Sequence, residues 1–188
     1  YARRGPMILI NATDMSMGMR FTFNQLLFNT MCSDLSQFHV ARACTASSAV
    51  PGLFTPVVLK NYAGSCGFVL PPNLNLSTTN YRLKEMKENL TIMLDPEEKP
   101  YIHLIDGGVA DNLGLRAIEE AIDSVGNIWT VMRSMRNENV HKVVFVVVNA
   151  ETKIESIWDK TEIMPELAGI LSNYTTIAIV RYNRETMA

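Results

Sequence analysis

Apolar residues along the chain form short runs whose spacing alternates between strand-like and helix-like. Residues 6–14 are an apolar run bounded by proline and aspartate, and residues 20–24 alternate between polar and apolar positions. The two runs therefore predict a pair of strands. Gly18 lies between them and supplies the glycine that a hairpin connection uses. Residues 24–31 fit a short amphipathic helix that follows the second strand.

The next hundred residues predict a second helix and then a long irregular stretch. Residues 33–50 begin with residue types that favour helix N-caps, and Pro51 ends the helix. The small residues at 43–49 would let this helix pack closely against a sheet. Residues 55–62 are an extended segment or a strand. Residues 61–100 hold Gly64, Gly67 and four prolines, so we expect an irregular excursion over the surface.

The remaining pattern predicts a strand, a helix and another strand, followed by a closing helix. Residues 101–106 and 142–150 are the strands, and the apolar core of the second, at 143–148, is expected to be buried. Residues 115–125 are the helix between them, and the closing helix covers about 165–182. A strand, a helix and a strand in this order predict a parallel α/β unit, so the fold class is α/β.

Length and charge narrow the classes of function. The chain has 188 residues, of which 47% are hydrophobic, and its net charge is -2. We expect one partial domain over residues 1–188, cut from a longer chain. Without a basic stripe, nucleic acid is not an expected partner. The apolar run at 143–148 is far shorter than the roughly 20 residues that cross a bilayer.

The three cysteines and three histidines show no pattern of a reactive or metal-binding site. Cys32, Cys44 and Cys66 follow no metal-ligand spacing, and we expect buried or free thiols, with Cys44 a small buried residue. The histidines are His39, His103 and His141. They lie far apart in the sequence and near no serine partner, so the sequence does not support a catalytic triad.

The stretch "IDGGVADNLG" at 105–114 holds the strongest candidate for chemistry. Asp106 ends a predicted strand, and the carboxyl ends of strands are where α/β proteins place their functional crevice. Gly107 and Gly108 permit positive φ and let a ligand or another backbone approach closely. Asp111 or Asn112 can cap the helix that starts near residue 115. Asp106 is then either a catalytic base or a residue that only ties its own loop together, and spacing alone leaves both readings open.

Two stretches in this order carry a family resemblance. "VARACTASSAVPGLFTPVVL" at 40–59 followed by "YIHLIDGGVADNLGL" at 101–115 resembles the patatin-like phospholipases, particularly their bacterial members. Residues 7–25 resemble the strand pair that precedes these motifs. The resemblance covers roughly residues 7–150, and it implies a three-layer α/β/α fold.

The resemblance implies a lipid acyl hydrolase that uses a Ser-Asp dyad, without histidine, metal or organic cofactor. The aspartate of the dyad falls on Asp106, and Gly107 and Gly108 shape the site. The family's serine stands in a G-x-S-x-G elbow before the matched region, and this chain has no such elbow. We therefore expect the serine and the oxyanion hole upstream of Tyr1. In "AGSCG" Ser65 imitates the motif, but no helix follows it, as an elbow requires.

Two hypotheses of function remain open. In the first, the chain is part of a serine-dependent lipid ester hydrolase with Asp106 as general base. We then expect the isolated chain to be inactive and the enzyme to contact a membrane surface. The second is a non-catalytic lipid-binding or scaffolding fragment of the same fold. Either way, unpaired strand edges and apolar surface would favour self-association of the chain. The sequence does not specify a compartment.

Overall fold

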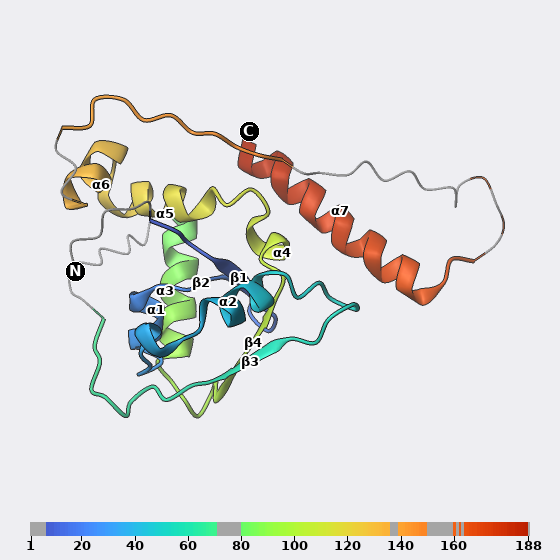
Figure 1. The fold of residues 1–188 in the computed structure, drawn as a ribbon, viewed down its shortest axis with the longest axis horizontal. Coiled ribbons are helices and arrows are strands. Elements are labelled where there is room, and N and C mark those ends of the chain that lie inside the picture. The colour runs from blue at the N-terminus through green and yellow to red at the C-terminus, as the bar shows by residue number, and fades with distance from the viewer. Residues whose placement is uncertain are drawn as a thin grey trace.

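The computed structural model describes residues 7–70, 80–135, 139–149, 160, 162 and 164–187. Its centre is a sheet of four strands in the order β2-β1-β4-β3 (Figure 1). The strands are β1 (Asn11–Asp14), β2 (Arg20–Thr22), β3 (Val57–Lys60) and β4 (Tyr101–Ile105). The chain thus has a mixed α/β structure, because eight helices, one of them a 3-10 helix, accompany this sheet in the described ranges.

The predicted amino-terminal hairpin is confirmed. β1 and β2 pair antiparallel, with Asn11 opposite Thr22 and Thr13 opposite Arg20. Gly18 in the connection has a φ of 67°, a conformation that glycine adopts without a steric penalty. The first strand is shorter than predicted, because it begins only at Asn11 and residues 7–9 are exposed.

Helices follow the hairpin as the sequence predicted, with one interruption. α1 (Gln25–Thr30) is capped by Asn24, whose side chain accepts a hydrogen bond from the Leu27 amide. The predicted helix at 33–50 is divided into the 3-10 turn η1 (Leu35–Gln37) and α2 (Val40–Ser47). Ala43 and Ala46 of α2 are almost fully buried, which is consistent with close packing of this helix against the sheet.

The prediction that residues 61–100 are irregular throughout was wrong. α3 (Tyr81–Met93) has 13 residues, and the Asn80 side chain caps it by accepting hydrogen bonds from the Arg82 and Leu83 amides. Leu83, Leu90 and Met93 of this helix are buried. The residues at 61–70 fit the expected loop, whereas 71–79 lie outside the described ranges.

The predicted parallel unit is also wrong. β4 pairs antiparallel with both β1 and β3, so every pairing in the sheet is antiparallel. The chain continues from β4 through α4 (Gly108–Asp111), α5 (Arg116–Val125), α6 (Ile128–Ser134) and α7 (Leu167–Met187). α5 and α7 confirm the two helices predicted after residue 114, but α4 and α6 were not predicted.

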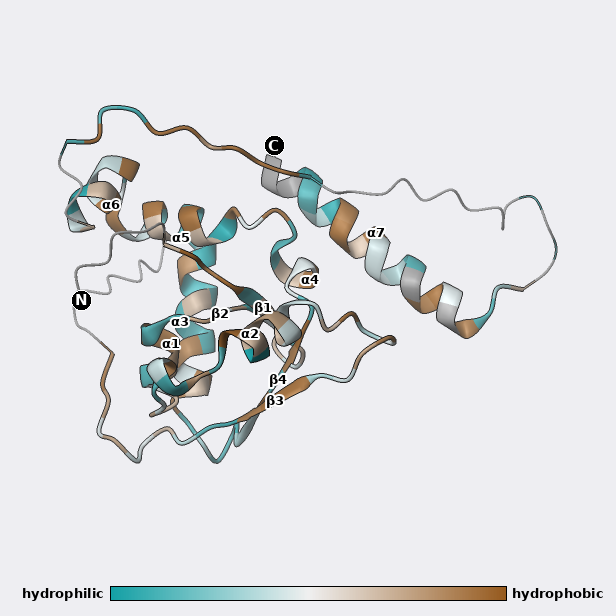
Figure 2. Cartoon of the chain, viewed as in Figure 1, coloured by the Kyte–Doolittle hydropathy of each residue, from teal (hydrophilic) through white to brown (hydrophobic). Residues whose placement is uncertain are grey.

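The apolar run at 143–148 is not the buried strand that its composition predicted. Residues 141–149 belong to no helix or strand, and they pair with none of the described strands. Val146 and Val148 are 84% and 80% exposed, and Figure 2 shows this segment as an apolar strip. A strand needs a neighbour to satisfy its backbone groups, and here no described strand offers one. Residue 150 lies outside the described ranges.

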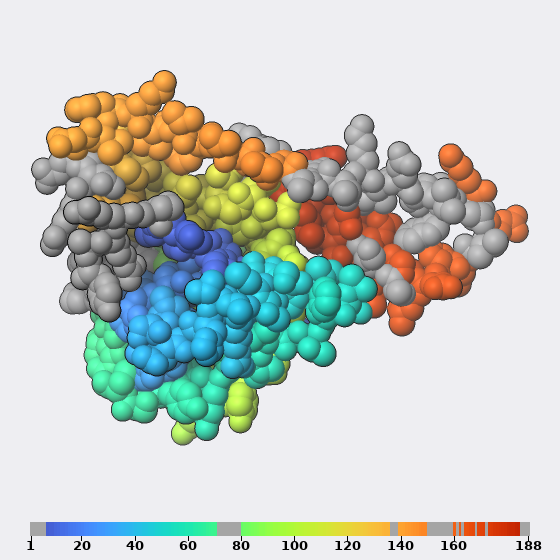
Figure 3. Space-filling model, in the orientation of Figure 1, coloured from blue at the N-terminus to red at the C-terminus, as the bar shows by residue number. Residues whose placement is uncertain are grey.

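The apolar core forms where the helices pack on the sheet. Phe21, Phe23, Phe28 and Phe38 contact one another through their rings. In the space-filling view residues 7–70 form the compact blue and teal part, while residues 139–149 lie along the top in orange and α7 lies on the right in red (Figure 3). The candidate residue Asp106 follows β4 directly and so leaves the sheet beside this core.

Candidate functional site

Asp106 lies at the end of β4, as the sequence predicted, and its backbone is held from two sides. Its amide donates to the Ala49 carbonyl at 2.9 Å, just beyond the end of α2. Its carbonyl accepts from the Thr13 hydroxyl of β1 at 2.8 Å. The same hydroxyl accepts from the Ala110 amide at 3.1 Å, so Thr13 joins the strand end to α4. The position of Asp106 is therefore fixed by neighbours that are distant in sequence.

One oxygen of the Asp106 carboxylate is engaged and the other is open. Oδ1 accepts a hydrogen bond from the Gly108 amide at 2.7 Å. Oδ2 has no hydrogen-bond partner among the residues that the structure describes. The bond to Gly108 is what the loop-tying reading predicted. The free oxygen is compatible with a catalytic base, because an oriented carboxylate with one unoccupied oxygen can accept a proton.

The two glycines after Asp106 act through close contact rather than through positive φ. Gly107 has a φ of -65°, and neither glycine is in the left-handed region. A Cβ on Gly107 would lie 2.4 Å from the Asn11 carbonyl oxygen. A Cβ on Gly108 would lie 3.0 Å from Asp106 Oδ1. Neither glycine uses the positive φ that its lack of a Cβ permits, and the expected close approach of another backbone is confirmed at Gly107.

Asp106 lines an open hollow of about 490 Å³. β1, the end of α2 and the segment from Asp106 to Gly114 form its walls. Its polar lining is Asn11, Cys44, Ser47, Ser48, Asp106, Asp111 and Asn112. Leu9, Ile10 and Leu113 add an apolar part. The hollow thus combines a carboxylate, amides and hydroxyls with an apolar margin, which is a lining that an ester with an acyl chain could use.

The hydroxyls in the hollow do not form a nucleophile elbow. Ser47 is the last residue of α2, and an elbow serine stands at the opposite, N-terminal end of its helix, where the dipole favours negative charge. The Ser48 hydroxyl donates to the Cys44 carbonyl at 2.9 Å. Ser65 lies outside the hollow, and its exposed hydroxyl donates to the Tyr62 carbonyl at 2.6 Å.

The cysteines differ from their predicted states. Cys32 and Cys66 form a disulfide, which joins the end of α1 to the loop after β3. Cys44 is free and exposed on α2, where it lines the hollow, so the prediction of a buried residue was wrong. Spacing alone could not identify the pair, because it does not show which residues come together in space.

Asp111 does more than the capping that the sequence predicted. Its Oδ1 accepts from the Leu115 amide at 3.1 Å, just before α5 begins at Arg116. Its Oδ2 faces the Arg20 guanidinium, with Nε 3.8 Å away, and the side chain of Asp111 is fully buried. Burial raises the pKa of Asp111, while backbone hydrogen bonds and the charges of Arg20 and Arg116 oppose that rise.

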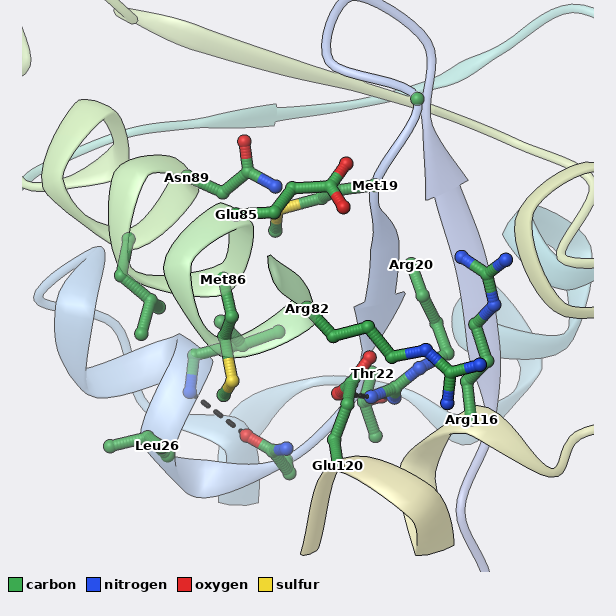
Figure 4. A pocket seen from close by; sticks show the side chains of 14 residues that line it. Met19, Arg20, Thr22, Leu26, Arg82, Glu85, Met86, Asn89, Arg116 and Glu120 are labelled. Carbon is green, nitrogen blue, oxygen red and sulfur yellow. Dashed lines mark hydrogen bonds and ion pairs between the residues drawn. The ribbon is translucent and has the colours of Figure 1, made fainter. Parts of the chain in front are cut away.

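A charged cavity of about 100 Å³ lies beside the hollow and was not predicted. Its charged lining is Arg20, Arg82, Arg116, Glu85 and Glu120. In Figure 4 the side chains of Arg20, Arg82 and Glu120 come together between β2, α3 and α5, whereas Glu85 lies apart from them beside Asn89. Arg20 forms an ion pair with Glu120, and Arg82 forms one with Glu119. Burial raises the pKa of Glu120. Burial, followed by the charge of Arg82, lowers the pKa of Arg116.

No group of three or more His, Cys, Asp or Glu side chains in the described ranges is arranged to hold a metal ion. Among the described helices, none is long and apolar enough to cross a membrane. The chain matches no protein-family model, no curated protein and no solved structure. The contacts around Asp106 therefore carry the functional argument.

Proposed function

We propose that the chain carries the general base of a serine-dependent lipid ester hydrolase of the patatin-like kind. The observation that supports this is the Asp106 carboxylate, which lines an open hollow and has one oxygen bound to the Gly108 amide, while the other oxygen has no hydrogen bond to a described residue. A general base needs this combination of fixed orientation and access. The order of the motifs around Asp106 resembles that of the patatin-like phospholipases, and this resemblance also supports the proposal.

In the proposed reaction Asp106 works with a serine supplied by a segment upstream of Tyr1. Asp106 takes the proton of the serine hydroxyl as the oxygen attacks the ester carbonyl, and the same proton is then given to the leaving alcohol. An acyl-enzyme results. Asp106 next takes a proton from water as that water attacks the acyl-enzyme, and it gives the proton to the serine oxygen as the fatty acid leaves. Gly107 and Gly108 shape the site by keeping the turn close to β1 and to the carboxylate.

The proposed fold of the whole domain is the three-layer α/β/α arrangement of that family. The four antiparallel strands would then be one part of a larger sheet. The unpaired apolar residues at 143–148 support this, because they have strand composition without a strand partner. Lipid esters are the proposed substrates, and we propose that the enzyme binds them at a membrane surface.

The test of the proposal is ester hydrolysis by the protein that includes the upstream segment. Asp106→Asn keeps the shape of the side chain and removes its ability to act as a base, so turnover should fall about 10²- to 10⁴-fold. Asp34→Asn is the matched control, because Asp34 Oδ1 also accepts from the amide two residues later, at 2.8 Å from Ser36. Near-normal turnover in Asp106→Asn would rule out the assignment.

A second candidate is a non-catalytic lipid-binding role, in which no serine complements Asp106. The exposed apolar side chains at 144–148 favour it. The two proposals differ in one cheap measurement, since the hydrolase becomes covalently labelled by a fluorophosphonate whereas the lipid-binding protein does not. The 188-residue chain on its own should hydrolyse no ester under either proposal.

A further inference from the structure

Arg20 connects two walls of the Asp106 hollow from the inside of the protein. Arg20 of β2 does not line the hollow, but lines the charged cavity beside it. Its Nη1 lies 3.5 Å from Asn11 Oδ1, and the Thr22 hydroxyl donates to the same oxygen at 2.8 Å. Its Nε lies 3.8 Å from Asp111 Oδ2. Asn11 and Asp111 both line the hollow, so Arg20 reaches two of its walls from behind.

The arginine is itself held in place. Nη2 pairs with Glu120 of α5, and Nη1 also donates to the Thr22 hydroxyl. Figure 4 shows Arg20, Thr22 and Glu120 on one side of the cavity, and Glu85, Met86 and Asn89 of α3 on the other. The side chains of Arg20 and Asp111 are 11% and 0% exposed, so their charges interact with little screening by water.

α4 depends on this connection at its carboxyl end. The turn has only four residues, and the Thr13 hydroxyl holds it at the Ala110 amide. Asp111 is its last residue, and its buried Oδ2 has the nearby Arg20 charge but no hydrogen bond. Loss of the Arg20 charge would leave this buried carboxylate with only the Arg116 charge and its backbone hydrogen bonds as compensation, and we expect the turn to open and hydrate it.

We propose that Arg20 is a positioning residue, which fixes the α4 turn through Asp111 and thereby orients the Asp106 carboxylate through the Gly108 amide. Arg20 contacts no reacting atom. It acts on Asp111 and Asn11, and these define the hollow in which Asp106 would meet its substrate. The inference rests on the proposed function only where it treats Asp106 as the base.

Amide hydrogen exchange of the chain tests this without any substrate. Arg20→Met removes the charge and keeps much of the side-chain length. The Gly108 amide should then exchange at least about tenfold faster relative to the Leu90 amide of α3, whose exchange reports opening of the core. The outcome is independent of the hydrolysis assay, because it reports the geometry at Asp106 whether or not a serine completes the site.

Lys99→Met is the matched control. Lys99 Nζ lies 2.8 Å from Asp14 Oδ2, and these side chains are 6% and 0% exposed, so a comparable buried pair is lost that includes no residue of α4. This control should leave the ratio of Gly108 to Leu90 exchange unchanged. If Arg20→Met does not fold, Arg20→Gln removes the same charge with a polar side chain and should give the same selective effect. An unchanged ratio, or an equal change in Lys99→Met, would overturn the proposal.

Discussion

At Gly107 the chain passes from β4 into α4 with the backbone of β1 directly beside it. The space for a side chain is already taken by the Asn11 carbonyl, which a Cβ would meet at 2.4 Å. At Gly108 a Cβ would meet the ends of two side chains, Asn112 at 2.9 Å and Asp106 at 3.0 Å. Backbone atoms cannot rotate away, whereas the ends of side chains can. The two adjacent glycines therefore differ in how strictly they are required.

Gly107→Ala should accordingly destabilise the protein more than Gly108→Ala does. We expect Gly107→Ala to lower the free energy of unfolding by about 1–3 kcal/mol, the usual cost of overpacking a well-packed site. Gly108→Ala should cost less, while it still displaces the Asp106 carboxylate. Denaturation in guanidinium chloride measures both variants. Equal stability of Gly107→Ala and the wild type would show that β1 and the turn are not packed as described.

Individual residues could be predicted from the sequence where their role is local. The position of Asp106 at a strand end was predicted correctly, because the apolar run before it and the two glycines after it are its neighbours in the sequence. Arg20 could not be identified, since its partners Asp111 and Glu120 are about a hundred positions away and no local pattern points to them. The hollow was likewise not predictable as a set of residues, because Ser47 and Asn11 reach it from different elements.

Among the elements, those that depend on their own sequence were predicted best. The hairpin and α1 follow from Gly18 and from the cap at Asn24. α3 was missed because the glycines and prolines around it dominated, although Leu83, Leu90 and Met93 recur at helical spacing. The parallel unit was predicted wrongly, because residues 142–149 form no strand and β4 instead pairs antiparallel with β1 and β3, to which no local period relates it.

The disulfide adds a link between elements that the sequence did not predict. Cys32 and Cys66 are separated by 34 positions, so the bond restricts the unfolded chain by about 3–4 kcal/mol on the loop-entropy scale. Cys66→Ser should therefore lower the denaturation midpoint, as should reduction of the wild type. Cys44→Ser is the control and should change little, because Cys44 is free and exposed. Three reactive thiols in the native, unreduced protein would contradict the pairing.

The molecule as a whole exposes more apolar surface than its small sheet can cover. The residues at 144–148 form one such strip, and α7 presents Leu167, Ile170, Leu171, Tyr174 and Ile177. β2 and β3 are the outer strands of the sheet, and none of the described strands pairs with their outer sides. Contiguous exposed apolar surface of this kind favours association.

The chain should consequently self-associate as its concentration rises. Sedimentation velocity measures this, and the double variant Val144→Lys with Val146→Lys should shift the chain toward the monomer. Val69→Lys is the control, because Val69 is 79% exposed but lies outside the strip. A wild-type chain that stays monomeric at all concentrations, or an unchanged double variant, would contradict this expectation.

The central claim is that Asp106 is the base that activates a serine. The most direct measurement is the rate at which a fluorophosphonate modifies the protein that includes the upstream segment, because this step needs the serine and its base but no lipid. The account predicts rapid labelling of the wild type and labelling about 10²- to 10⁴-fold slower in Asp106→Asn. Equal rates in the two proteins would contradict it.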